Sequence, residues 1–191
     1  MNESAAVRLR QAVRRIHDAA RERTATGRGP EEADDVVGTF ATDGALGFDP
    51  FPFLRALYEA GSHAVVIGQV AGIMHGSVEP TGDLDLLWDG TSEQARALRD
   101  ALTAAGRTHM PDLDRPQVAY QVAGVSGDLC TPALLWGELD VTPCLARAVS
   151  THDPAGFTIR YAARDDLIHM RRSLGRPKDH RRADELARLS P

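Results

Sequence analysis

The chain has 191 residues, and its 22 Lys and Arg against 27 Asp and Glu give a formal net charge of −5. This length suits one domain with a hydrophobic core and is short for two. No stretch approaches the roughly 20 apolar residues of a membrane-spanning helix, and the Arg-rich N-terminus lacks the apolar segment of a secretory signal. We therefore expect a cytoplasmic protein with no membrane partner. Cys130 and Cys144 are too few for a disulfide framework and lack the spacing of a zinc site.

The charges are unevenly distributed along the chain. Residues 1–30 and 160–191 each carry a balance of +4, so residues 31–159 carry −13. An acidic centre between basic ends fits a site that gathers carboxylates for cations and keeps Arg nearby for an anionic ligand. An acidic, solvated surface is the alternative interpretation.

The first predicted element is a helix over residues 4–25. Leu9, Val13, Ile16 and Ala20 form its apolar stripe. A break follows at 24–30, and residues 31–49 are acidic and weakly periodic. We expect residues 1–45 to form a helical extension and linker, serving as a partner-binding arm or a homodimer clasp, and residues 46–191 to form the main domain.

The regular part of the chain begins near residue 52. Its predicted elements are, in order, a helix over 53–60, a strand over 63–67, a helical turn over 70–74, a strand over 84–88, a helix over 92–105, strands over 118–123, 138–142 and 157–161, and helices over 164–174 and 179–189. Mixed strands followed by helices predict an α+β fold, with a mixed sheet covered by helices on one face.

One strand carries a pair of carboxylates. In Thr81-Gly82-Asp83-Leu84-Asp85-Leu86, alternation along a strand places Asp83 and Asp85 on one face, about 7 Å apart. Such a pair is unfavourable unless a cation lies between them, and Mg²⁺ prefers hard oxygen ligands. Asp140, in the predicted strand 138–142, is the expected third carboxylate, and Asp128 and Asp89 are weaker candidates.

Two groups of motifs resemble the small, single-domain branch of the DNA-polymerase-β-like nucleotidyltransferase superfamily, which includes toxin–antitoxin proteins. The first is a strand ending at Gly68, then His75-Gly76, then Thr81-Gly82-Asp83-Leu84-Asp85, with the acid pair starting fifteen residues after Gly68. The second is Asp166-Leu167-Ile168 followed by Gly175-Arg176-Pro177-Lys178-Asp179. The resemblance covers residues 53–189 and implies a polymerase-β-like core with C-terminal helices.

The resemblance also implies roles for individual residues. Gly68 and Gln69 would border a nucleoside triphosphate, and Asp83 and Asp85 would bind two Mg²⁺ ions, with Mn²⁺ as an alternative. Asp140 would bind one metal and help to activate the nucleophile. Lys178, helped by Arg176, would neutralise phosphate charge. Gln69 departs from the family pattern, which has a small residue there; its amide would either contact phosphate or crowd the site.

Three functions remain open on the sequence alone. The first is transfer of a nucleotide to the hydroxyl of an RNA end or a protein. The second is adenylylation of a small molecule such as an aminoglycoside or lincosamide antibiotic. The third is a catalytically inactive relative that binds a partner or acts as an antitoxin.

Overall fold

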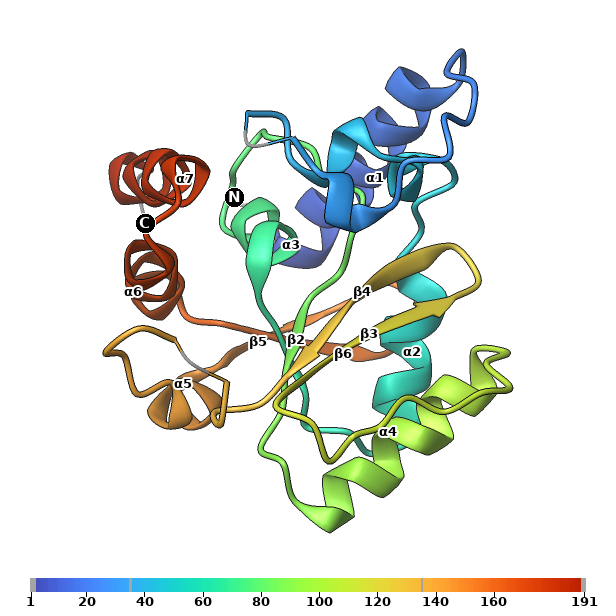
Figure 1. Cartoon of the computed structure of the whole chain (residues 1–191), viewed down its shortest axis with the longest axis vertical. Coiled ribbons are helices and arrows are strands. Elements are labelled where there is room, and N and C mark those ends of the chain that lie inside the picture. Colours follow the sequence, from blue (N-terminus) through green and yellow to red (C-terminus); the bar gives the residue numbers. More distant parts are fainter. Residues whose placement is uncertain (1–2, 35, 135, 190–191) are drawn as a thin grey trace.

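The computed structural model describes residues 3–34, 36–134 and 136–189 and has an α+β fold built on one mixed sheet (Figure 1). The sheet order is β3-β4-β2-β1-β6-β5. The strands are β1 Val65–Val66, β2 Leu86–Leu87, β3 Gln117–Val122, β4 Val125–Cys130, β5 Val149–His152 and β6 Thr158–Tyr161. In the described part of the chain, no helix is long and apolar enough to cross a membrane.

The sheet is mixed because its central strands pair in both directions. β1 pairs antiparallel with β2 and parallel with β6, and β2 pairs parallel with β4. The outer pairs, β3 with β4 and β5 with β6, are antiparallel. This arrangement agrees with the α+β class and the mixed sheet predicted from the sequence.

The helices lie at both faces of the sheet and at its end, so the prediction of a sheet covered by helices on one face is wrong. They are α1 Ala5–Ala20, α2 Phe51–Glu59, α3 Gly68–Met74, α4 Ser92–Ala104, α5 Thr142–Arg147, α6 Arg164–Leu174 and α7 Pro177–Arg188, with short 3-10 helices at Pro30–Glu32, Thr39–Ala41 and Asp43–Ala45. α2 and α4 pack against each other, α1 against α3, and α6 against α7 (Figure 1). The helices predicted from periodicity are confirmed.

The N-terminal helix belongs to the hydrophobic core. Leu9 is fully buried, and it joins one continuous cluster with residues of the sheet and of α2. Arg10 forms a bidentate pair with Asp153, which follows β5, at 2.8 and 2.6 Å. Its guanidinium also lies 4.1 Å from the ring centre of Phe51. α1 is therefore packed against the rest of the fold.

The predicted strand over 138–142 is wrong, because local turn chemistry begins a helix there. Gly137 has a φ of +65°, which breaks an extended chain. The side chain of Asp140 accepts a hydrogen bond from the backbone N–H of Thr142 (2.9 Å), where α5 begins. Pro143 then occupies the first turn of the helix, a position that suits its fixed φ.

Two strands were not predicted, β4 and β5. β4 contains Ser126, Gly127 and Asp128, which are poor strand formers. Gly127 is required at its position because a Cβ there would lie 2.0 Å from the carbonyl oxygen of Leu84. Tertiary pairing therefore overrides local preference in this strand.

Candidate functional site

A cavity of about 700 Å³ opens on the sheet face away from α2. Its floor is formed by Asp83 and Asp85, which precede β2, and by residues of β3 and β4. Its walls are formed by α6, α7 and the N-terminal residues Glu31, Ala33, Gly38 and Thr39. The charged residues that line it are Glu31, Asp83, Asp85, Arg107, Asp128, Arg171, Arg176, Lys178, Asp179 and Arg182. Side chains of both charge signs therefore line one open cavity.

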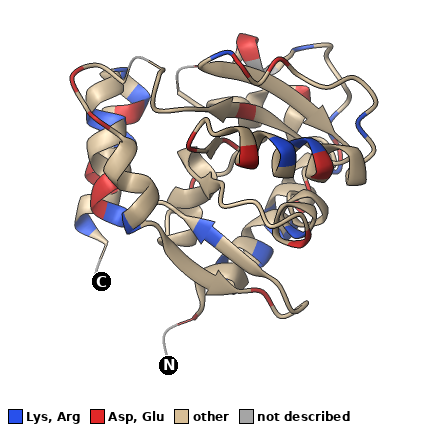
Figure 2. Cartoon of the chain, turned by 90° about the horizontal axis from the view of Figure 1, so that it is seen from below, with Lys and Arg blue, Asp and Glu red and all other residues tan. Residues whose placement is uncertain are grey.

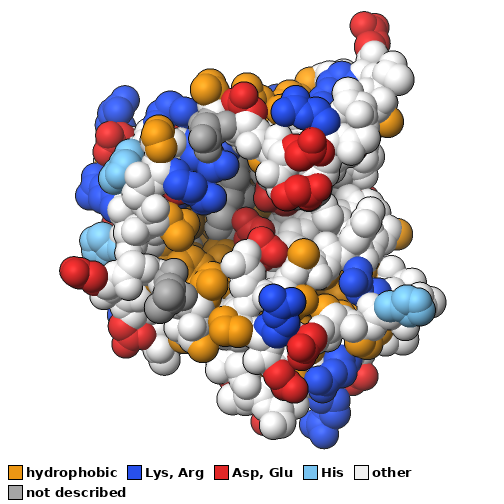
Figure 3. Space-filling model, viewed as in Figure 1, with side chains coloured by type: hydrophobic (Ala, Val, Ile, Leu, Met, Phe, Trp, Pro, Cys, Tyr) orange, Lys and Arg blue, Asp and Glu red, His pale blue; other side chains and the backbone are white. Residues whose placement is uncertain are grey.

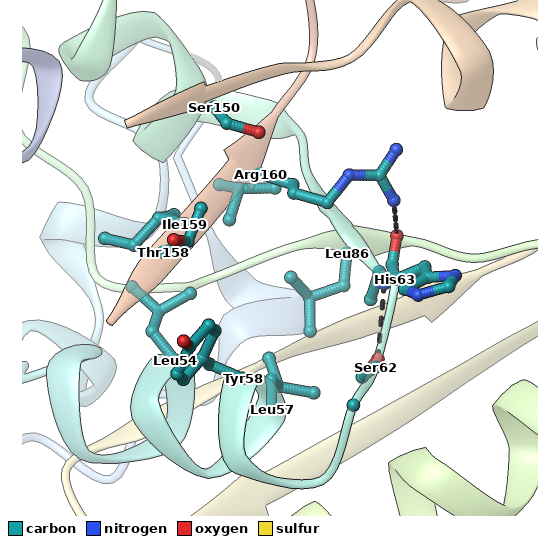
Figure 4. Close-up of a pocket in the computed structure, with 13 residues that line it drawn as sticks. Leu54, Leu57, Tyr58, Ser62, His63, Leu86, Ser150, Thr158, Ile159 and Arg160 are labelled. Atoms are coloured by element: carbon teal, nitrogen blue, oxygen red, sulfur yellow. Dashed lines mark hydrogen bonds between the residues drawn. The ribbon is translucent and has the colours of Figure 1, made fainter. Parts of the chain in front are cut away.

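A second cavity, of about 360 Å³, lies on the other face of the sheet between α2 and β6 (Figure 4). Leu54, Leu57 and Leu86 are part of its apolar lining. Arg160 also lines it and donates to the carbonyl oxygen of His63. No described carboxylate lines this space. We therefore take the larger cavity as the candidate site.

Asp83 and Asp85 lie together at the cavity floor, while Leu84 between them is fully buried. The Oδ1 atom of Asp83 accepts hydrogen bonds from the hydroxyls of Thr81 (2.6 Å) and Thr39 (2.8 Å). The backbone continues the strand ladder, because the N–H of Ile67 donates to the carbonyl oxygen of Asp85 (2.9 Å). The alternation along the chain thus presents both carboxylates to the same space.

The third carboxylate at this floor is Asp128, on β4. The parallel register pairs Leu86 with Leu129, so the residue before each, Asp85 and Asp128, are neighbours. The backbone N–H of Asp128 donates to Oδ1 of Asp85 at 3.2 Å. Gln117 on β3 donates to the Oδ2 atom of Asp128 at 2.8 Å.

The pKa of Asp85 is raised well above its ordinary value. Loss of solvent around the carboxylate is the largest cause, followed by the negative charges of Asp83 and Asp128. A cation at this position would relieve both effects.

Asp140 does not join the three carboxylates. Its side chain is exposed and does not line the cavity. Hydrogen bonds from the hydroxyl and then the backbone N–H of Thr142 lower its pKa. The placement of Asp140 on a strand beside Asp83 and Asp85 is therefore wrong. Asp128 was only a weaker candidate on the sequence, and the alternation of Ser126, Asp128 and Cys130, all of which line the cavity, is the signal that could have identified it.

The three carboxylates supply oxygen atoms, which are the ligands that a hard divalent cation prefers. In the described ranges, no group of three His, Cys, Asp or Glu side chains is arranged to hold a metal ion on its own. Mg²⁺ is commonly held by one or two carboxylates together with water and substrate phosphates. Asp83 and Asp85, with Asp128 beside them, suit a Mg²⁺ ion whose remaining ligands are water and phosphate oxygens.

Gly68, the first residue of α3, has a φ of +64° that favours glycine. Gln69, which follows it, is 4% exposed, and its amide is engaged within the protein. Its Nε2 donates to the hydroxyl of Ser77 (3.0 Å) and the carbonyl oxygen of Glu79 (2.9 Å), and its Oε1 accepts from Arg171 (2.8 Å). Gln69 thus ties α3 to α6.

Arg171 on α6 is a buried cation at the cavity wall, 4% exposed. Besides Gln69, it donates to the carbonyl oxygens of Gly68 (3.1 Å) and Arg182 (3.0 Å). Loss of solvent, and then the charge of Arg182, lower its pKa to about 10, so it stays charged at neutral pH. These hydrogen-bond acceptors are all uncharged, and the carboxylates of Asp179, Glu185 and Glu79 act on Arg171 only through their charge. The sequence analysis did not single out Arg171.

The other cations of this wall come from α7 and the turn before it. Arg176 donates to both oxygens of the buried Asp179, at 2.5 and 3.3 Å. Arg182 donates to Oε1 of Glu79 through Nε (2.9 Å) and a terminal nitrogen (2.6 Å). Lys178 also lines the cavity. Charges of both signs alternate along these C-terminal helices (Figure 2).

The hollow is visible from one side of the molecule (Figure 3). Asp and Glu side chains lie within it and along one rim, and Lys and Arg side chains gather along the opposite rim. This separation suits a ligand that carries phosphate groups together with bound cations. No protein-family model, curated protein or solved structure matches this chain in comparisons with known proteins.

Proposed function

We propose that this protein is a metal-dependent nucleotidyltransferase of the polymerase-β-like type, which moves a nucleoside monophosphate from a nucleoside triphosphate to an acceptor hydroxyl. The observation that carries the proposal is the joint presence of Asp83, Asp85 and Asp128 on the floor of a cavity walled by Arg171 and Lys178. The motif resemblance from Gly68 to Asp85, and again at 175–179, supports the same reading.

In this proposal each group of the cavity has a chemical task. Mg²⁺ ions held by Asp83, Asp85 and Asp128 would supply charge neutralisation at the phosphates and the attacking oxygen. Arg171 and Lys178 hold the triphosphate by its negative charge. The acceptor oxygen forms a bond to the α-phosphorus, the bond from the α-phosphorus to the bridging oxygen of the β-phosphate breaks, and pyrophosphate leaves. Asp128 receives the hydroxyl proton.

Gln69 does not argue for an inactive relative. The nitrogen of its side-chain amide donates to Ser77 and Glu79, and the oxygen accepts from Arg171. Gln69 therefore differs from the usual small residue by forming buried hydrogen bonds within the protein. The backbone at Gly68 stays against Asp85, since a Cβ on Gly68 would lie 2.5 Å from the carboxylate.

The basic residues of α1 do not lie where they could select an acceptor. α1 packs on α3 and contacts β5, and none of its residues lines the cavity. The arginines of this helix therefore do not form an acceptor wall beside the carboxylates. An RNA end, a protein and a small hydroxylated molecule all remain acceptors to be tested.

The test is a transfer assay with Mg²⁺ and each of the four α-³²P-labelled nucleoside triphosphates. Total tRNA, cell lysate and a panel of aminoglycosides and lincosamides serve as acceptors, with wild type run beside Asp83→Asn. We expect label to reach one acceptor class with wild type only. If wild type transfers no label and shows no Mg²⁺-dependent nucleotide binding by calorimetry, the proposal is wrong.

A further inference from the structure

Residues 39–45 touch the loop that carries Asp83 directly, although 37 to 43 positions separate the contacting residues from Gly82 in the sequence. A Cβ built on Gly82 would lie 2.6 Å from the backbone nitrogen of Ala45 and 2.7 Å from the carbonyl oxygen of Thr39. A Cβ on Gly44 would likewise lie 2.7 Å from the carbonyl oxygen of Gly82. The backbone of residues 39–45 therefore packs directly against the backbone of the loop that carries Asp83, and we call residues 39–45 the cover of this loop.

Thr39 makes the polar contacts of this cover. Its hydroxyl donates to Oδ1 of Asp83 (2.8 Å), lies 3.0 Å from the hydroxyl of Thr81, and accepts from the backbone N–H of Gly82 (3.1 Å). The donor from Thr81 reaches the same oxygen, Oδ1. Two donors on one carboxylate oxygen fix the rotation of the carboxyl group and leave the lone pairs of Oδ2 for another partner.

Thr39 is itself held in place from both sides. Its carbonyl oxygen accepts from the buried hydroxyl of Thr42 (2.7 Å). Gly38, next to it, packs against the guanidinium of Arg182, where a Cβ would lie 2.8 Å from a terminal nitrogen. Arg181 on the same helix donates to the carbonyl oxygen of Val36 (2.6 Å). The segment thus bridges α7 and the carboxylate loop.

We propose that Thr39 is a positioning residue for the metal-binding carboxylate Asp83, and that residues 36–45 are part of the site and not a linker to it. This inference rests on the proposed function, because it concerns the metal that Asp83 would bind. In this proposal Thr39 lines the cavity but acts on the metal only through the orientation of Asp83. Groups that orient metal ligands typically change metal affinity by about 10- to 100-fold when they are removed.

The experiment measures Mn²⁺ binding to the full chain by electron paramagnetic resonance, without nucleotide. Thr39→Val removes the hydroxyl at nearly constant shape, and Thr39→Ser restores it. Thr103→Val is the matched control, because Thr103 is exposed on α4 and donates only to the carbonyl oxygen of Arg99 in its own helix. Thermal unfolding of each variant shows that it is folded at the temperature of the binding measurement.

We expect Thr39→Val to raise the dissociation constant of Mn²⁺ about tenfold, with Thr39→Ser and Thr103→Val close to wild type. Wild-type affinity in Thr39→Val would overturn the inference and leave the proposed function standing. Equal weakening in Thr39→Val and Thr39→Ser would also overturn it, since the hydroxyl would not be the cause. A wild-type protein that binds no Mn²⁺ would overturn the metal site and this inference together.

Discussion

Gly68 and Asp85 are in direct contact: a Cβ built on Gly68 would lie 2.5 Å from Oδ2 of Asp85. β1 ends two residues before Gly68 and pairs antiparallel with β2, which begins directly after Asp85. The start of α3 at Gly68 therefore lies against the carboxylate. Any side chain at this position would push Asp85 away from the cavity floor.

We therefore predict that Gly68→Ala lowers the free energy of unfolding and abolishes nucleotide transfer. The left-handed φ of +64° costs a non-glycine residue about 1 kcal/mol, and the overlap with Asp85 adds about 1–3 kcal/mol. Gly61→Ala is the matched control, because its φ is +70° and a Cβ there meets no atom within 4 Å. Urea unfolding of both variants separates the contact from the backbone strain; equal losses would contradict the prediction.

The raised pKa of Asp85 predicts how stability depends on pH in protein stripped of metal with EDTA. Below the pKa that Asp85 has in the unfolded chain, the side chain is protonated in both the native and the unfolded state and does not lower the free energy of unfolding. As pH rises, the unfolded chain loses this proton first, so the native state loses stability until pH passes the raised native pKa. Asp85→Asn should thus be more stable than wild type near neutral pH, and the difference should shrink below about pH 4.

Added Mg²⁺ should make wild type more stable than Asp85→Asn near neutral pH. It stabilises wild type by binding the native state, and Asp85→Asn should respond far less. Asp100→Asn, at an exposed position on α4, is the control in the same urea titrations. A pH-independent difference between Asp85→Asn and wild type would contradict the predicted pKa shift.

Asp128 and Asp140 should differ sharply in transfer assays. Asp128→Asn removes a carboxylate of the cavity floor, and we expect kcat to fall about 10²-fold or more. Asp140→Asn alters a side chain that starts α5 outside the cavity, and kcat should stay within twofold of wild type, with a loss of stability below about 1 kcal/mol. The reverse ranking would mean that Asp140 reaches the reacting atoms.

Gln69 should contribute to stability more than to nucleotide binding. Gln69→Met leaves an N–H of the buried Arg171 without its acceptor, which costs about 2 kcal/mol. Gln121→Met, exposed on β3, should stay within about 0.5 kcal/mol of wild type. Denaturant unfolding compares the two; an unchanged stability in Gln69→Met would show that the amide serves a ligand instead.

The N-terminal helix should unfold together with the sheet. Leu9→Ala removes a fully buried side chain of the common core and should cost about 3 kcal/mol in one cooperative transition. Val78→Ala, at a residue 80% exposed, should have almost no effect. Circular dichroism and Trp fluorescence, followed on the same samples, would reveal a separable extension as two transitions.

The sequence by itself determined those features that depend on local periodicity. The apolar stripe of α1, the helix α6 and the alternation of Asp83 and Asp85 around the buried Leu84 all follow from the geometry of one helix or one strand. The α+β class followed from the order of such elements.

Only the tertiary structure decided which distant residues meet Asp83 and Asp85. Asp128 arrives through the parallel register of β2 and β4, and Thr39 through a segment that looked like a linker. Asp140, which matched a strand pattern, lies instead in the turn before α5, where its side chain accepts a hydrogen bond from the backbone of Thr142. Periodicity along one strand carries no information on its neighbour or register, because pairing is set by contacts between residues far apart in sequence.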